Sequence, residues 1–161
     1  MMFKIKPIEN RLKQLVREVW VNNWGSDLMV TRGKVYRVLD YPGYVAVEND
    51  KIIGLIVYRI EDKECEILSL DSLSENRGIG TRLLEEVIKI SRNNGCNRVW
   101  LITSNDNTNA MRFYQKRGFE FKEVYINAIE DARKIKPQIP IVGYDNIPIK
   151  HEIEMELIFK K

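Results

Sequence analysis

The sequence is poor in the residues that build metal sites and disulfide frameworks. It has two cysteines, Cys65 and Cys96, and one histidine, His151, and their spacing is not that of a zinc site. We therefore expect a protein without a metal ion, in a reduced compartment such as the cytoplasm. The N-terminus alternates apolar and polar residues and lacks the apolar block of a secretory signal peptide.

An excess of one charge and a long apolar run are also missing. The 161 residues carry 26 basic and 23 acidic side chains, a net charge of +3, which does not favour binding to nucleic acid or to a membrane surface. No apolar run approaches the roughly 20 residues that cross a bilayer. The length and the 44% share of hydrophobic residues suit one globular domain, which we expect to span residues 1–161.

Hydrophobic periodicity and turn residues predict an alternation of strands and helices. In order, the predicted elements are a strand at 3–6, a helix beginning after Asn10 and ending near 22–25, strands at 35–39, 44–47, 52–60 and 64–73, a helix ending at 93–95, a strand at 99–102, a helix at 107–117, a strand from 119, a loop at 127–150 and a strand at 153–159.

The spacing of these elements predicts a mixed sheet. Short turns at 48–51 and 62–63 make three consecutive strands antiparallel. The helix that follows them leads to an apolar run at 99–102, so strand, helix and strand form a parallel crossover, right-handed as such connections usually are. The predicted fold class is α/β, with a mostly antiparallel sheet of about seven strands flanked by helices.

The segment from Glu75 to Leu84 joins a predicted strand to a predicted helix and contains Gly78 and Gly80. Two glycines one residue apart let the backbone turn tightly without a Cβ in the way. The first N–H groups of the helix lack intrahelical partners, and together with the helix dipole they form an anion site suited to phosphate. Taken alone, this motif is equally consistent with a plain tight turn.

A second motif lies in the helix predicted at 107–117. Asn105 or Asp106 is expected to cap this helix, and Gly118 to close it in a left-handed conformation. Asn107 and Tyr114 fall on one stripe of the helix together with Ala110, because they are spaced by three and four residues.

These two motifs and the order of elements resemble the GCN5-related N-acetyltransferase family, whose members bind acetyl-coenzyme A. The segment from Asn107 to Phe119 is similar to that family's signature Asn-x-x-Ala-x-x-Phe-Tyr-x-x-x-Gly-Phe at every named position. The glycine segment is similar to its pyrophosphate-binding motif, except that Glu75 stands where the family usually has Arg or Gln. The implied fold is that of the acyl-coenzyme A N-acyltransferases, and the resemblance is weakest at 24–42 and 127–150.

The resemblance implies a donor site and a role for each of its residues. Tyr114 would protonate the leaving thiolate as general acid, and Asn107 would contact the pantetheine arm. A backbone N–H near the end of the strand before the loop would polarise the thioester carbonyl. Arg77 or Arg82 would supply the charge that Glu75 does not. The residues expected to bind the coenzyme are Leu70, Asp71, Ser72, Arg77, Gly78, Ile79, Gly80, Thr81, Arg82 and Asn107.

The acceptor is less well defined than the donor. A primary amine of a small molecule or of a protein would receive the acetyl group, and the irregular segments flanking Trp24 and Pro137 are expected to form its binding side. Trp20, Trp24 and Tyr36 could line this cleft or pack in the core. Basic residues in these segments could favour an acceptor with negative charge or simply keep the protein soluble; they are Arg32, Lys34, Arg37, Arg133, Lys134 and Lys136.

Two questions stay open from the sequence. The general base could be Glu64, Glu66 or Asp71, each of which could equally be a solvated strand residue. The alternative function is a non-catalytic sensor or scaffold that binds acyl-coenzyme A without turnover. We expect no nucleic acid or membrane partner, no catalytic role for the cysteines, and allow for a homodimer.

Overall fold

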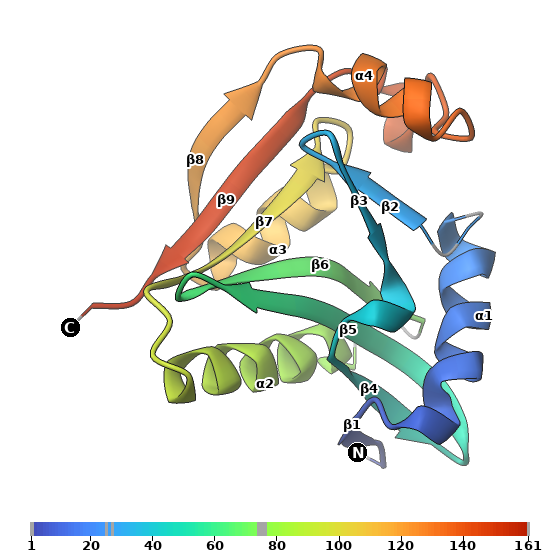
Figure 1. Cartoon of the computed structure of the whole chain (residues 1–161), viewed down its shortest axis with the longest axis vertical. Helices are drawn as coiled ribbons and strands as arrows, with labels where there is room; N and C mark the ends of the chain where they lie inside the picture. The colour runs from blue at the N-terminus through green and yellow to red at the C-terminus, as the bar shows by residue number, and fades with distance from the viewer. Residues whose placement is uncertain (1, 25, 27, 74–76, 161) are drawn as a thin grey trace.

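The computed structural model describes residues 2–24, 26, 28–73 and 77–160 (Figure 1). Its helices are α1 (Lys13–Trp24), α2 (Ile79–Asn93), α3 (Thr108–Lys116) and α4 (Ala128–Ile135). Its strands are β1 (Lys4–Pro7), β2 (Leu28–Thr31), β3 (Lys34–Arg37), β4 (Gly43–Glu48), β5 (Lys51–Glu61), β6 (Glu64–Ser72), β7 (Arg98–Ser104), β8 (Glu120–Tyr125) and β9 (Glu152–Ile158).

One sheet of seven strands forms the centre of the molecule, in the order β1-β4-β5-β6-β7-β9-β8. Strands β6 and β7 are parallel, and every other neighbouring pair is antiparallel. Strands β2 and β3 form a separate hairpin. The predicted mixed, mostly antiparallel sheet of about seven strands, with a crossover through α2, is therefore confirmed.

The two faces of the sheet carry different cores, as the alternation of side chains along a strand requires. On one face the apolar stripe of α2, which includes Leu83, Leu84 and Val87, packs with sheet residues such as Ile56 and Val99. On the other face, the residues of α1 and of the β2–β3 hairpin pack on β4, β5 and β6; this second cluster contains Val16, Trp20, Tyr36, Val45, Leu55, Val57 and Leu68. Tyr36 is thus a core residue, Trp20 both packs in this core and contributes to the wall of the cavity described below, and the side chain of Trp24 lies outside the described part.

Strands β6 and β7 diverge, and this divergence positions the site. Their described register runs only from Glu64–Arg98 to Ile67–Leu101, although β6 continues to Ser72 and β7 to Ser104. The register of β6 against β5 shifts just beyond Ile67, as at a β-bulge, which bends the strand away from its neighbour. In Figure 1 the two strands open toward the end of the sheet where the β2–β3 hairpin lies.

The backbone groups on the open side of β6 follow from its hydrogen bonds to β5. The N–H of Leu73 donates to the carbonyl of Ile53 on the β5 side (2.8 Å). Because successive N–H groups along a strand point in opposite directions, those of Leu70 and Ser72 point toward the gap between β6 and β7.

Two local predictions are wrong, and the strand expected at 35–39 is present but ends earlier. The segment 127–150 is not only loop, because α4 lies within it and buries Ile129 and Ala132. The strand expected at 35–39 is one arm of the β2–β3 hairpin, and it ends at Arg37. Helix α3 is capped by Asn107 rather than by Asn105 or Asp106, because the Asn107 side chain accepts a hydrogen bond from the N–H of Ala110 (3.2 Å).

Candidate functional site

The start of α2 presents backbone donors that have no acceptor within the helix, as its two glycines predict. Gly78 precedes the helix with φ of 72°, a left-handed conformation that glycine adopts without strain. The first intrahelical bond of this turn runs from the N–H of Arg82 to the carbonyl of Gly78 (3.0 Å). The N–H groups without an intrahelical acceptor are therefore those of Ile79, Gly80 and Thr81. The N–H of Arg82, which was also expected to bind the coenzyme, is therefore engaged within the helix.

The two arginines of this segment are engaged elsewhere. The guanidinium of Arg77 forms a two-point ion pair with the carboxylate of Glu48, with 2.9 Å between Nη1 and Oε1, and this pairing lowers the pKa of Glu48. The guanidinium of Arg82 lies 5.3 Å from the centroid of the Phe3 ring. Glu75, the departure from the family motif, lies outside the described residues. In the described part of this loop, an anion would therefore be bound mainly by backbone N–H groups.

Helix α3 braces the start of α2. Arg117, at its C-terminal end, donates to the hydroxyl of Thr81 from Nε (3.1 Å) and from Nη2 (2.6 Å), and from Nη1 to the carbonyl of Phe113 (2.8 Å). A Cβ at Gly80 would lie 3.4 Å from the Phe113 ring. The two sequence motifs, far apart in the chain, therefore form one contiguous structure.

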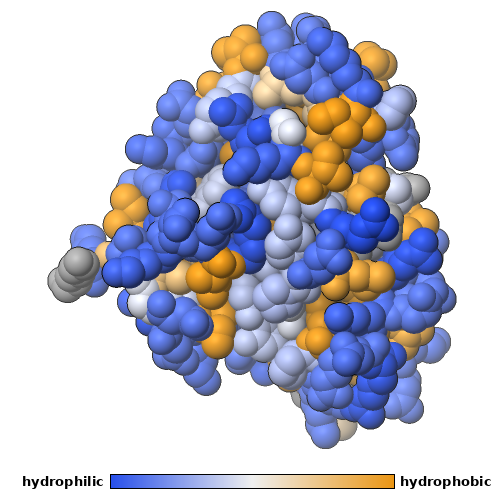
Figure 2. Space-filling view, in the orientation of Figure 1, coloured by the Kyte–Doolittle hydropathy of each residue, from blue (hydrophilic) through white to orange (hydrophobic). Residues whose placement is uncertain are grey.

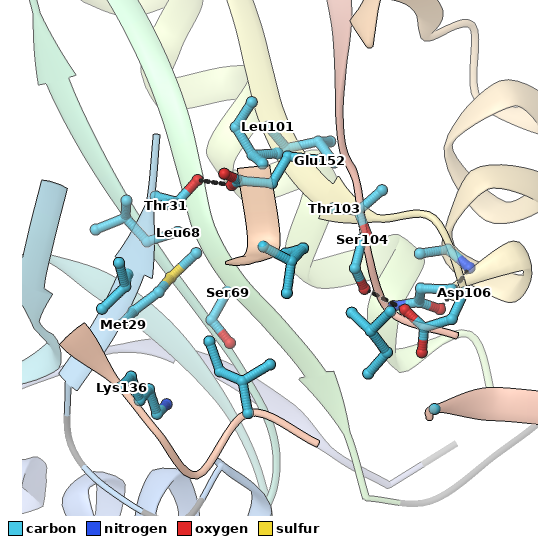
Figure 3. Close-up of a pocket in the computed structure, with 18 of the residues that line it drawn as sticks. Met29, Thr31, Leu68, Ser69, Leu101, Thr103, Ser104, Asp106, Lys136 and Glu152 are labelled. Carbon is cyan, nitrogen blue, oxygen red and sulfur yellow. Dashed lines mark hydrogen bonds between the residues drawn. The ribbon is translucent and has the colours of Figure 1, made fainter. Parts of the chain in front are cut away.

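A cavity of about 690 Å³ opens where β6 and β7 diverge (Figure 3). Three predicted residues line it, namely Leu70, Asn107 and Tyr114, together with Ala110 of the same helical stripe. Asp71 and Ser72, at the end of β6, are not among its described lining residues, and the Ile79 side chain is buried in the core.

Segments distant in sequence complete the cavity wall. Strand β2 contributes Leu28 to Thr31, and the segment after α4 contributes Lys136, Gln138, Ile139, Pro140, Val142, Gly143 and Tyr144. The irregular segments expected to form the acceptor side thus line this cavity, and their role in binding the acceptor stays a prediction. On the face seen in Figure 2, apolar side chains reach the surface in separate groups between hydrophilic ones.

Tyr114 reaches the cavity from α3 and is only 6% exposed. Its ring packs edge-on against Phe113 (5.1 Å between centroids) and tilted against Phe119 (5.2 Å). Burial, aided by the negative charge of Asp71, raises the pKa of the Tyr114 phenol well above its usual range, and Arg117 opposes this only in part. The phenol is therefore protonated at neutral pH and can donate a proton.

The carboxylates named as candidate bases lie away from the cavity or at its margin. Glu66 is bound to Nε of Arg59 (2.9 Å), and Glu64 to Nε of Arg98 (2.9 Å). Asp71 accepts a hydrogen bond from the hydroxyl of Ser69 (2.8 Å), and Ser69 does line the cavity. Of the three, Asp71 is thus the one connected to the cavity.

Sequence reasoning missed two buried carboxylates in the cavity wall. Asp106 accepts hydrogen bonds from the hydroxyl of Ser104 and from the N–H of Tyr144 (3.1 Å). Glu152, the first residue of β9, accepts one from the hydroxyl of Thr31 (3.0 Å). Only the polarity of Asp106, two residues after the end of β7, could have drawn attention to it, because Tyr144 and Thr31, which bind the two carboxylates, lie far from them along the chain.

Most of the basic residues expected near the acceptor are engaged or face elsewhere. Arg133 donates to the carbonyls of Ile139, Pro140 and Ile149, Arg32 stacks on the Tyr125 ring, and Lys134 pairs with Asp131. Lys136 is the exception that lines the cavity, where its Nζ donates to the carbonyl of Leu28 (2.9 Å) and burial lowers its pKa.

The described residues lack two particular features. None of the described helices is long and apolar enough to span a membrane. Within the same residues, no three His, Cys, Asp or Glu side chains cluster as a metal site would require.

The chain is similar to proteins of one family in sequence and in structure. Residues 10–119 match the model of the Acetyltransferase (GNAT) family. "Uncharacterized protein YdhI" of Bacillus subtilis is 44% identical over 153 residues, which are 94% of this chain and 96% of that protein. The IAA acetyltransferase from Bacillus cereus superposes with a TM-score of 0.75 at 17% identity, covering 98% and 99% of the two chains.

A GNAT family acetyltransferase from Elizabethkingia anophelis, solved with acetyl-CoA bound, superposes with a TM-score of 0.70 at 21% identity and covers 98% of each chain. The match to the family model, which spans more than half of the chain, agrees with the seven-stranded sheet and with the motifs at Gly78 and Asn107. The protein therefore belongs to the GNAT acetyltransferase family.

Proposed function

We propose that residues 1–161 form a single domain that transfers an acetyl group from acetyl-coenzyme A to a primary amine, by direct attack of the amine on the thioester. The observation that carries this proposal is the position of Tyr114. A protonated phenol lies in the wall of a cavity that is also lined by Leu70, whose backbone N–H points toward the gap between β6 and β7. Acyl transfer needs both elements, an oxyanion donor and a proton donor for the leaving group.

The hydrogen-bond donors of the donor side suit coenzyme A. The N–H groups of Ile79, Gly80 and Thr81 suit a pyrophosphate, since a helix start binds anions without a basic side chain. From there the gap between β6 and β7 leads past Leu70 and Asn107, whose polar groups suit the amides of the pantetheine arm. The acetyl-CoA found in the Elizabethkingia anophelis neighbour supports this assignment.

In the proposed reaction, the neutral amine forms a bond to the thioester carbonyl carbon. The Leu70 N–H donates to the carbonyl oxygen as it gains negative charge. As the carbon–sulfur bond breaks, Tyr114 gives its proton to the thiolate, and solvent returns a proton to the phenolate. The amine loses its extra proton to water or to Asp71, which reaches the cavity through Ser69.

The experiment is consumption of acetyl-coenzyme A with a panel of primary amines, comparing wild type with Tyr114→Phe. Turnover by wild type that falls strongly in the variant supports the proposal. Tight binding of acetyl-coenzyme A without turnover of any amine would instead support the sensor or scaffold. The departure at position 75 keeps this second function under consideration, because an acidic residue there does not help to bind phosphate.

A further inference from the structure

Glu152 is a buried carboxylate in the wall of the cavity. It begins β9, lies opposite Ser104 in β7 and Tyr125 in β8, and is 3% exposed. In Figure 3 its side chain points toward Thr31 of β2. Its described hydrogen bonds come from the Thr31 hydroxyl (3.0 Å) and from the N–H of Arg32 (3.3 Å to each oxygen). Both donors are neutral.

The other two buried glutamates have cationic partners. Glu66, 2% exposed, is bound to Arg59, and Glu154, 7% exposed, is bound to Nη1 of Arg98 (2.8 Å). Across the described part of the chain, no lysine, arginine or histidine nitrogen lies within 4.0 Å of the Glu152 carboxylate. A buried charge is costly unless an opposite charge accompanies it. Glu152 is thus the buried glutamate that lacks a cation, and it is the one that faces the cavity.

The remaining charges of the cavity do not supply this cation. The acidic and basic residues in the described part of the cavity wall are Asp106, Glu152 and Lys136. Lys136 and Glu152 lie at separate ends of the drawn pocket, and the ammonium of Lys136 is bound to the Leu28 carbonyl (Figure 3). The described wall therefore has more negative than positive charge, which favours a cationic occupant.

We propose that the acceptor carries a second cationic nitrogen, besides the amine that is acetylated, and that this nitrogen binds the carboxylate of Glu152. The acceptor class is then an aliphatic diamine or polyamine. This inference rests on the proposed acetyl transfer. It replaces the sequence-based suggestion of an anionic acceptor, whose basic residues are mostly engaged within the protein.

The partner of Glu152 is the second nitrogen rather than the reacting one for a chemical reason. The reacting nitrogen must be neutral to attack, and an ion pair would stabilise its protonated form. An ion pair with a distant nitrogen holds the acceptor in place without that cost. Glu152 is therefore a specificity-determining residue, and its effect should depend on the charge of the far end of the acceptor.

The test compares α,ω-diamines of three to six carbons with amino alcohols of the same length, in which a hydroxyl replaces the second amine. We expect wild type to prefer the best diamine by roughly tenfold to a hundredfold in kcat/KM, the range of a hydrogen bond between charged groups. In Glu152→Gln this preference should fall to about threefold or less, through KM rather than kcat. Glu154→Gln is the matched control and should keep the preference, because Glu154 is not a described wall residue.

Three outcomes would overturn the inference. They are equal use of diamines and amino alcohols by wild type, a diamine preference that survives in Glu152→Gln, or an equal loss with both acceptors, which would place Glu152 at the reacting nitrogen. In each case acetyl transfer itself stands. The wild-type comparison needs no variant, so it decides even where Glu152→Gln does not fold.

Absence of turnover with every amine would instead contradict the proposed function. Calorimetry then tests the inference separately, by titrating 1,4-diaminobutane into the coenzyme A-loaded protein. Binding by wild type and by Glu154→Gln, but not by Glu152→Gln, supports a cation site at Glu152. No heat of binding with wild type would overturn it.

Discussion

Arg117 binds the hydroxyl of Thr81 through two of its guanidinium nitrogens, and so joins the end of α3 to the first turn of α2. Thr81→Val removes the acceptor and leaves both donors without their partner. We expect a loss of about 1–2 kcal/mol in the free energy of unfolding and several-fold weaker binding of coenzyme A. Urea denaturation and calorimetry measure these two quantities. Unchanged affinity would show that α2 keeps its position without this brace.

Gly80 is expected to be essential for the coenzyme because a side chain there would block the approach to the backbone. A Cβ would make only an ordinary van der Waals contact with the Phe113 ring, at 3.4 Å, so Gly80→Ala should keep the fold and weaken binding only slightly. Gly80→Val, with two further methyl groups, should abolish it while unfolding stays cooperative. Calorimetry with coenzyme A measures the series. Wild-type affinity in Gly80→Val would contradict the assignment of a pyrophosphate site.

Tyr114→Phe should affect rate much more than affinity. A general acid typically contributes 10²–10⁴-fold, so kcat should fall by roughly a hundredfold or more, while the Kd of acetyl-coenzyme A should change by less than about threefold. Stopped assays at saturating amine measure kcat, and calorimetry measures the Kd of acetyl-coenzyme A. Equal losses in both would make Tyr114 a binding residue only.

The pH profile gives a second check on Tyr114. Because burial raises the pKa of its phenol, the proton stays in place at alkaline pH, and kcat of wild type should not decline between pH 8 and about pH 10 on account of this group. A decline in that range that is absent from Tyr114→Phe would contradict the proposed proton donor.

Gly143 should separate acceptor binding from donor binding. A Cβ there would lie 2.0 Å from Oδ2 of Asp106 and 2.8 Å from Cδ1 of Ile149. Gly143→Ala should therefore displace the segment that Asp106 holds through the N–H of Tyr144. We expect KM for the amine to rise by about tenfold, with the Kd of acetyl-coenzyme A unchanged. An unaltered amine KM would show that this wall does not contact the acceptor.

The regular elements were predictable because their patterns are strong and local. The three strands before Gly78 and the apolar stripe of α2 appear where periodicity placed them. Helix α4 was missed because it has eight residues and Pro137 follows it closely. Strand β2 and its pairing with β3 were missed because the turn between them places Arg32 and Gly33 at positive φ, and Arg-Gly is not a usual pair for such a turn.

The donor side of the site was predictable from contiguous motifs, and the acceptor side was not. Gly78, Gly80, Asn107 and Tyr114 belong to two short segments with characteristic spacing. Glu152 instead meets Thr31 across 121 positions of sequence, and no local pattern in either segment indicates that contact. A hydrogen bond of this kind becomes visible only once the chain is folded.

The divergence of β6 from β7 gives different parts of the chain different roles in packing and in forming the cavity. Helix α2 packs its core on one face of the sheet, whereas β2 and the residues after α4 form the far wall of the cavity. Substitutions in that far wall can reshape what enters without disturbing the packing of α2 on the sheet. A new acceptor preference is therefore accessible, by selection or by engineering, through a few residues at the periphery while the donor chemistry is left intact.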